Sequence, residues 1–172
     1  MAILEIKTAD ELFGEQELAA RWTARRAARQ TEVFRKILRG FLDGGGPIAV
    51  PEIVGASLDA ATVHDALAAL DDDDLIRIRD GQVDIAYPFS ASATPFVVRL
   101  PGGEARYACC AVDALGIAPM AGIRVEIRSR CHHCTALLEL SVDPDRPRAE
   151  ADGIILWIGK MSDDRCRVTD SL

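Results

Sequence analysis

The sequence lacks an apolar run long enough to cross a membrane. Nearly half of its 172 residues are hydrophobic, yet no uninterrupted stretch approaches the ~20 residues that a spanning helix needs. The first residues, Met1–Lys7, also lack the basic start and long apolar core of a secretion signal. We therefore expect a cytoplasmic protein of one medium or two small domains, large enough to bury a hydrophobic core.

The sequence also lacks the even number of cysteines that a framework of disulfides would need. The chain has five, all in its last two-fifths, and an odd number without an export signal argues against disulfides and for free or metal-facing thiols. A single cytosolic cysteine is often just a small buried hydrophobic residue, but the clustering points to chemistry for the group. The five are Cys109, Cys110, Cys131, Cys134 and Cys166.

Positive charge is scarce in the middle third of the chain. Residues 1–40 carry eight Lys/Arg and six Asp/Glu, residues 41–100 carry three and ten, and residues 101–172 carry nine and eleven. The middle segment therefore accounts for the whole net charge of −7. This distribution bears on nucleic-acid binding, because phosphate backbones are bound by positive surfaces.

The first half resembles a winged helix-turn-helix module. A capping box at Thr8–Glu11 predicts a helical stretch that reaches about Arg39, with an amphipathic segment at residues 59–70 after it. Residues 75–79 and 82–87 alternate around Asp80-Gly81, which predicts a hairpin. Four arginines of the first stretch indicate a solvated helix face rather than an anion site: Arg21, Arg25, Arg26 and Arg29.

This module is poorly equipped to bind DNA. The helix that would enter the groove, residues 60–67, has no Arg or Lys and runs into the four aspartates of residues 71–74. The negative electrostatic potential of these aspartates repels phosphates, so nucleic-acid binding is not expected. We interpret His64 as a surface residue rather than a ligand.

The second half is predicted to be β-rich. The expected elements are strands at residues 96–100, 123–128, 137–142 and 154–158, a short helix that carries Cys110 and Asp113, and a loop at residues 116–122. The fold class is therefore α+β. A helical, winged-helix-like domain at residues 1–90 precedes a small β-sheet domain with short helices at residues 91–172.

One segment, residues 107–115, combines a nucleophile with a possible acid. In a helix, Cys110 and Asp113 lie on one face and can act on one substrate. A thiolate is a soft metal ligand or nucleophile, and a carboxyl group whose pKa is raised by burial or a nearby thiolate can donate a proton. Taken alone, Asp113 would be an ordinary residue of a helix surface.

Cys131-His132-His133-Cys134 has the C-x2-C spacing of half a zinc site. A full site needs two more ligands, and Cys109, Cys110, His132 or His133 could supply them. The alternative interpretation is a hairpin turn whose cysteines face the core or solvent.

The segment Tyr107-Ala108-Cys109-Cys110-Ala111-Val112-Asp113-Ala114-Leu115 resembles the Tyr-x-x-Cys-Ala-x-Asp-x-Leu motif of the organomercurial (alkylmercury) lyases. Pro119 and Gly122 follow as in that family, residues 127–131 correspond to its Val-x-Ser-x-Cys strand end, and residues 138–144 to a strand that ends in Val-x-Pro. The resemblance covers roughly residues 33–144. In the family the winged-helix-like part is structural.

The resemblance implies protonolysis of a carbon–mercury bond without a cofactor. Cys110 would capture mercury, a second cysteine would join it, and Asp113 would deliver the proton to carbon. The mercury ion would stay on the thiolates until a small thiol or a metal-accepting protein takes it, while Cys131 would be structural. The second thiol would be Cys166, which stands in a polar segment unlike the family's, or Cys109, so the chain would be a shortened and divergent member.

Two other functions remain open at this point. One is a non-catalytic protein that binds mercury, copper or zinc on Cys109, Cys110, Cys131 and Cys134. The other is a metal-responsive regulator that uses the winged helix.

Overall fold

The computed structural model describes residues 31–54, 59–148, 151–156 and 169. The expected capping box at residues 8–11, the four arginines of the N-terminal stretch and Cys166 lie outside these residues. No helix in the described ranges is long and apolar enough to cross a membrane. The helices are α3 (Thr31–Gly44), α4 (Val50–Ile53), α5 (Ala60–Asp72) and α6 (Ala111–Ala121).

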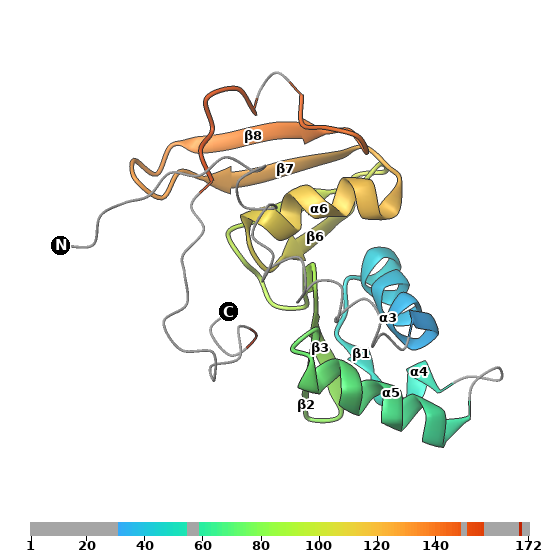
Figure 1. Ribbon diagram of the computed structural model, residues 1–172. Helices are drawn as coiled ribbons and strands as arrows, with labels where there is room; N and C mark the ends of the chain where they lie inside the picture. Colours follow the sequence, from blue (N-terminus) through green and yellow to red (C-terminus); the bar gives the residue numbers. More distant parts are fainter. Residues whose placement is uncertain (1–30, 55–58, 149–150, 157–168, 170–172) are drawn as a thin grey trace, which may run out of the picture.

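One antiparallel sheet runs through the described part of the chain (Figure 1). Its strand order is β1-β3-β4-β6-β5-β7-β8, with β2 paired to β3. The predicted α+β class is confirmed, while the division near residue 90 stays a prediction, since the sheet continues through the β4–β6 pair. The strands are β1 (Ile48–Ala49), β2 (Ile76–Arg79), β3 (Gln82–Ala86), β4 (Phe89–Ser90), β5 (Val97–Arg99), β6 (Ala105–Ala108), β7 (Val125–Arg130) and β8 (Leu137–Val142).

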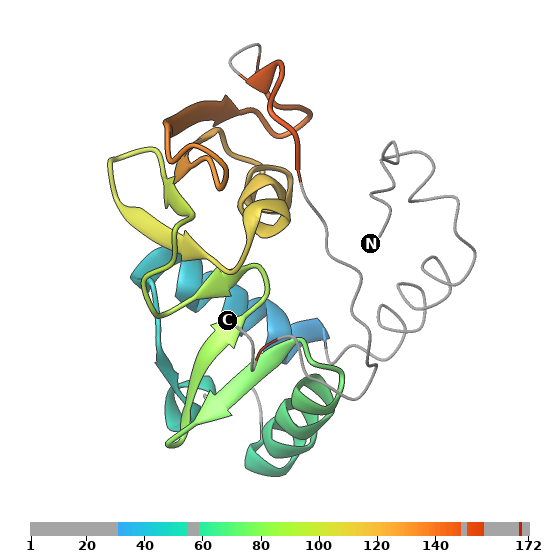
Figure 2. The ribbon, with the colours of Figure 1, turned by 90° about the vertical axis from the view of Figure 1, so that its left-hand side faces the viewer.

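The predicted helix and hairpin of the first half are confirmed. The carboxylate of Asp59 caps α5 by accepting the Thr62 N–H at 2.9 Å. Asp80 and Gly81 turn β2 into β3 with φ angles of 50° and 75°, which suits a tight hairpin. Figure 2 shows α5 beside this hairpin. The winged-helix assignment itself stays a prediction.

Contacts between the two halves of the chain hold the beginning of the second half in place. Phe41 of α3 stacks on Phe89 of β4 with ring centroids 5.9 Å apart. Arg106 of β6 donates to the carbonyls of Leu42 and Asp43 at 2.7 and 2.6 Å, which satisfies carbonyls at the C-terminal end of α3. Strand β6 is thereby held in place two residues before Cys110.

Helix α6 packs on β6 and β7 (Figure 1). The residues of β7 alternate between buried and exposed, so Val125 and Ile127 form part of the core. The expected loop at residues 116–122 is wrong, because α6 continues through Pro119 until Gly122 closes it with φ 68°. Burial of Ile117 and Ala118 against the sheet outweighs the helix-breaking tendency of Gly and Pro.

The strand expected at residues 154–158 is also wrong over its described part. Residues 154–156 pair with no other strand among those described, and their side chains are exposed by 37% to 75%. Trp157 and Ile158 lie outside the described residues. An apolar run forms a strand only when a partner satisfies its backbone groups.

Candidate functional site

The start of α6 brings Cys110 and Asp113 together. The segment expected to be helical begins as a strand, since Tyr107 and Ala108 belong to β6 and the helix starts only at Ala111. Cys110 has extended φ and ψ angles of −147° and −178° and is the N-cap residue. The two side chains therefore meet at the helix terminus rather than along one helical face.

Cys110 and Asp113 occupy the N-cap and N3 positions of α6. The Asp113 N–H donates to the Cys110 sulfur at 3.5 Å, which is the hydrogen bond that an N-cap side chain accepts. The thiol of Cys110 and the carboxyl group of Asp113 are close enough for each to shift the pKa of the other. Cysteine thus stands in the place of the serine of a capping box, and aspartate in the place of its glutamate. The three-residue spacing between the N-cap and N3 positions therefore also places a thiol beside a carboxylate.

Burial sets the protonation of both groups. It raises the pKa of Cys110 to about 11, with a further rise from the hydrogen bond to Asp113. It also raises the pKa of Asp113 above the usual 3.8, while the hydrogen bonds from Cys110 lower it. Near neutral pH, Cys110 therefore keeps its proton and directs it toward the carboxylate of Asp113.

Cys109 is oriented differently from its neighbour. Its side chain is 4% exposed and its thiol donates to the Phe89 carbonyl at 3.2 Å. Burial, together with the charges of Asp113 and Cys110, raises the pKa of Cys109 far above its usual value. Cys109 is therefore a buried, protonated thiol in the wall of the site.

Tyr87 belongs to the candidate site, although no sequence pattern pointed to it. Its hydroxyl oxygen is buried and has no hydrogen-bond partner among the described residues. Burial and the charges of Cys109, Asp74, Asp113 and Cys110 raise the pKa of Tyr87 well above its usual value. It is thus a neutral phenol within electrostatic range of the Cys110–Asp113 pair.

Replacing Tyr87 with phenylalanine should raise the stability of the free protein by about 1 kcal/mol. A buried hydroxyl without a partner costs roughly 1–3 kcal/mol of desolvation, and phenylalanine keeps the ring while removing that cost. Urea unfolding of the wild type and Tyr87→Phe measures the difference. A loss of stability on this substitution would mean that the hydroxyl has a partner in the folded protein.

A bidentate ion pair lies under the site. Arg77 of β2 is buried and donates to the two carboxylate oxygens of Asp84 at 2.9 and 2.8 Å. The same guanidinium donates to the carbonyl of Thr169, whose hydroxyl in turn donates to Asp74 at 2.6 Å. Thr169 is completely buried. The chain at Thr169 is therefore fixed against β2, next to Tyr87 and Cys109, whose pKa values respond to Asp74 and Arg77.

Cys131 and Cys134 lie in the connection between β7 and β8, away from the buried face. Both are free thiols; Cys131 is half-buried and Cys134 is exposed. No three His, Cys, Asp or Glu side chains within the described ranges gather closely enough to hold a metal ion. The single site expected from Cys109, Cys110, Cys131 and Cys134 is therefore not formed by these residues.

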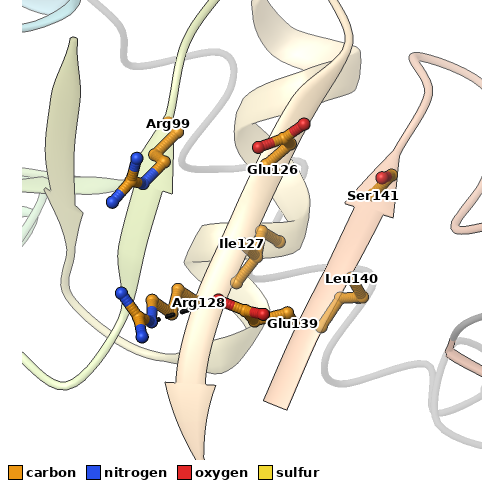
Figure 3. Close-up of a pocket in the computed structure, with 7 residues that line it drawn as sticks. All are labelled: Arg99, Glu126, Ile127, Arg128, Glu139, Leu140 and Ser141. Carbon is orange, nitrogen blue, oxygen red and sulfur yellow. Dashed lines mark ion pairs between the residues drawn. The ribbon is translucent and has the colours of Figure 1, made fainter. Parts of the chain in front are cut away.

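An open pocket lies on the opposite, solvent-facing side of β5, β7 and β8 (Figure 3). It is lined by charged residues, among them Arg99 and the ion pair of Arg128 with Glu139, whose atoms lie 3.2 Å apart. The pocket has no thiol, and α6 packs on the other face of the sheet. The start of α6, rather than this pocket, is therefore the candidate site.

Comparisons with known proteins point to one family. Residues 89–172 match the sequence model of the alkylmercury lyases, MerB, and thus confirm the resemblance predicted from residues 107–131. No curated protein matches the chain. Among solved structures, the mercury-bound form of MerB2 is similar with a TM-score of 0.64 and 22% identity, over 78% of this chain and 66% of that one. This likeness establishes a common fold, and the chain spans 66% of the length of that relative.

Proposed function

We propose, from the match of residues 89–172 to the alkylmercury lyase family, that this protein cleaves carbon–mercury bonds by protonolysis. The observation that carries the proposal is the placement of Cys110 and Asp113 together at the start of α6, where the Asp113 N–H donates to the Cys110 sulfur. It joins a soft ligand for mercury to a carboxylate that can receive and return one proton.

The first step is capture of the organomercurial by Cys110. Mercury(II) is soft and prefers thiolate, so the sulfur forms a bond to mercury and the metal's labile ligand leaves as an anion. The thiol proton moves to the neighbouring carboxylate of Asp113, whose N–H already donates to the same sulfur. Burial favours the neutral form of Asp113 and so supports this transfer.

The second step breaks the carbon–mercury bond. A second thiol releases its proton to solvent and binds mercury as a thiolate, which increases the electron density on the carbon. The carbon then takes the proton from Asp113 and leaves as a hydrocarbon. The carboxylate is regenerated, and mercury remains bound by two sulfurs. A small thiol or a metal-accepting protein then removes the ion. Each proton and electron pair is accounted for by the thiols and the carboxylate, so this scheme requires no cofactor.

We propose Cys166 as the second thiol. Cys109 is buried and donates its proton to a carbonyl, so it is poorly placed to form a thiolate. Cys166 stands three residues before Thr169, which is held by Arg77 and Asp74 near Tyr87 and Cys109. The short separation in sequence between Cys166 and this anchored residue supports Cys166 as the candidate for the second thiol.

Purified protein with a phenylmercury salt and a small thiol should release benzene, measured by gas chromatography. We expect Cys166→Ser to reduce the rate about 10²-fold or more, because one thiolate activates carbon less than two. Cys109→Ser should reduce it far less and serves as the matched control. Stoichiometric mercury binding without benzene would support a non-catalytic metal-binding protein instead. An equal effect of the two substitutions would contradict the assignment of Cys166.

A further inference from the structure

The β7–β8 connection carries a thiol pair that the proposed reaction does not use. Cys131 directly follows β7, and Cys134 comes three residues later, before β8 begins. Both sulfurs are free. Strands β6 and β7 each pair antiparallel with β5 and so run parallel. Cys110 and Cys131 therefore follow the same ends of strands that are two positions apart, roughly 10 Å between their axes.

The two cysteines stand at the two ends of one short turn. Their C-x2-C spacing is the one in which two thiolates of a turn hold a single metal ion. Cys131 is half-buried and Cys134 is exposed, so a metal ion can reach both from solvent.

Backbone hydrogen bonds fix the shape of this turn. The Thr135 N–H donates to the Cys131 carbonyl at 2.8 Å, and the Cys131 N–H donates to the Ala136 carbonyl at 2.9 Å. Thr135 itself has φ 61°, unusual for a β-branched residue. Its carbonyl accepts a hydrogen bond from Arg130 at 3.1 Å. The turn therefore presents the two cysteines in a defined arrangement before any ligand binds.

We propose that Cys131 and Cys134 form a second site for a soft metal ion, which binds mercury(II) between the two sulfurs independently of the lyase reaction. Two thiols and one mercury(II) ion give a bis-thiolate complex and release two protons to solvent. Mercury(II) is satisfied by two thiolates, whereas zinc requires four ligands in structural sites. Two is the number of ligands that the turn supplies.

Mercury titration of the full-length protein tests this site in a background that removes the proposed lyase thiols. The Cys110→Ser/Cys166→Ser variant is titrated with mercuric chloride in excess glutathione, and bound mercury is counted by native mass spectrometry. We expect one tightly held ion per chain. Adding Cys131→Ser or Cys134→Ser should weaken binding about 10²–10⁴-fold, because the second thiolate then no longer binds intramolecularly.

His132→Ala/His133→Ala in the same background is the matched control and should bind mercury like its parent. Circular dichroism on heating should show equal stability for all variants, since Cys134 and its neighbours are exposed. The proposal is overturned if the Cys131→Ser and Cys134→Ser variants hold mercury as tightly as their parent. It is equally overturned if the reduced protein binds zinc between two chains in preference to mercury, or if the parent binds no mercury against glutathione.

Discussion

Replacing Cys110 with serine is expected to reduce benzene release from a phenylmercury salt to the rate without protein, a loss of about 10³-fold or more. The hydroxyl of serine is a hard ligand that does not form a stable bond to mercury(II), so neither mercury capture nor the proton transfer to Asp113 can occur. The fold should remain, because serine is among the best N-cap residues and can accept the Asp113 N–H in place of the sulfur.

Two further variants separate the chemical role of Cys110 from its role as the N-cap residue of α6. Cys110→Ala removes both the thiol and the cap, and should cost an additional 0.5–2 kcal/mol of stability relative to Cys110→Ser. Cys134→Ser removes an exposed thiol and should leave benzene release unchanged. Substantial activity of Cys110→Ser, at equal protein concentration and with intact circular dichroism, would show that another thiol captures the substrate.

Replacing Asp113 with asparagine is expected to slow benzene release about 10²–10⁴-fold, the range that a positioned general acid contributes. Asparagine has nearly the same shape, but it cannot take the thiol proton or return it to carbon. The thiol of Cys110 can still lose its proton to solvent and bind mercury, so single-turnover experiments should show a stable protein–mercury–phenyl adduct. Rapid loss of phenyl from this adduct would mean that the proton comes from elsewhere.

The same substitution should raise thermal stability at neutral pH. The folded protein raises the pKa of Asp113 above its usual 3.8, mainly through burial. The stability gained from holding this proton is fully present below pH ~3.8 and is lost as the pH rises through the folded-state value. Asp113→Asn never carries the buried charge, so its Tm should exceed that of the wild type at pH 7, and the difference should shrink toward zero at acidic pH. A lower Tm than wild type at pH 7 would contradict the burial of the Asp113 charge.

Local sequence patterns correctly predicted the helices and strands that depend only on neighbouring residues. The alternation around Asp80-Gly81 predicted a hairpin, and the apolar spacing of residues 59–70 predicted α5, because turn geometry and helical periodicity depend on neighbouring residues alone. The motif at residues 107–115 likewise identified Cys110 and Asp113 and indicated the family. Gly116 and Pro119 led to the wrong prediction of a loop, because only their local preference was considered. The packing of α6 on the sheet outweighs that preference.

The sequence by itself therefore identified the candidate side chains for the chemistry, and it determined that one part of the chain is acidic and another rich in thiols. Only the tertiary structure showed what the two adjacent cysteines do, because Cys110 caps α6 while the thiol of Cys109 donates to the Phe89 carbonyl on a neighbouring strand. It also brought Tyr87 within electrostatic range of the Cys110–Asp113 pair and held Thr169 against Arg77, 92 residues away in sequence. Contacts of that range depend on how the whole sheet assembles, and no local pattern of residues encodes them.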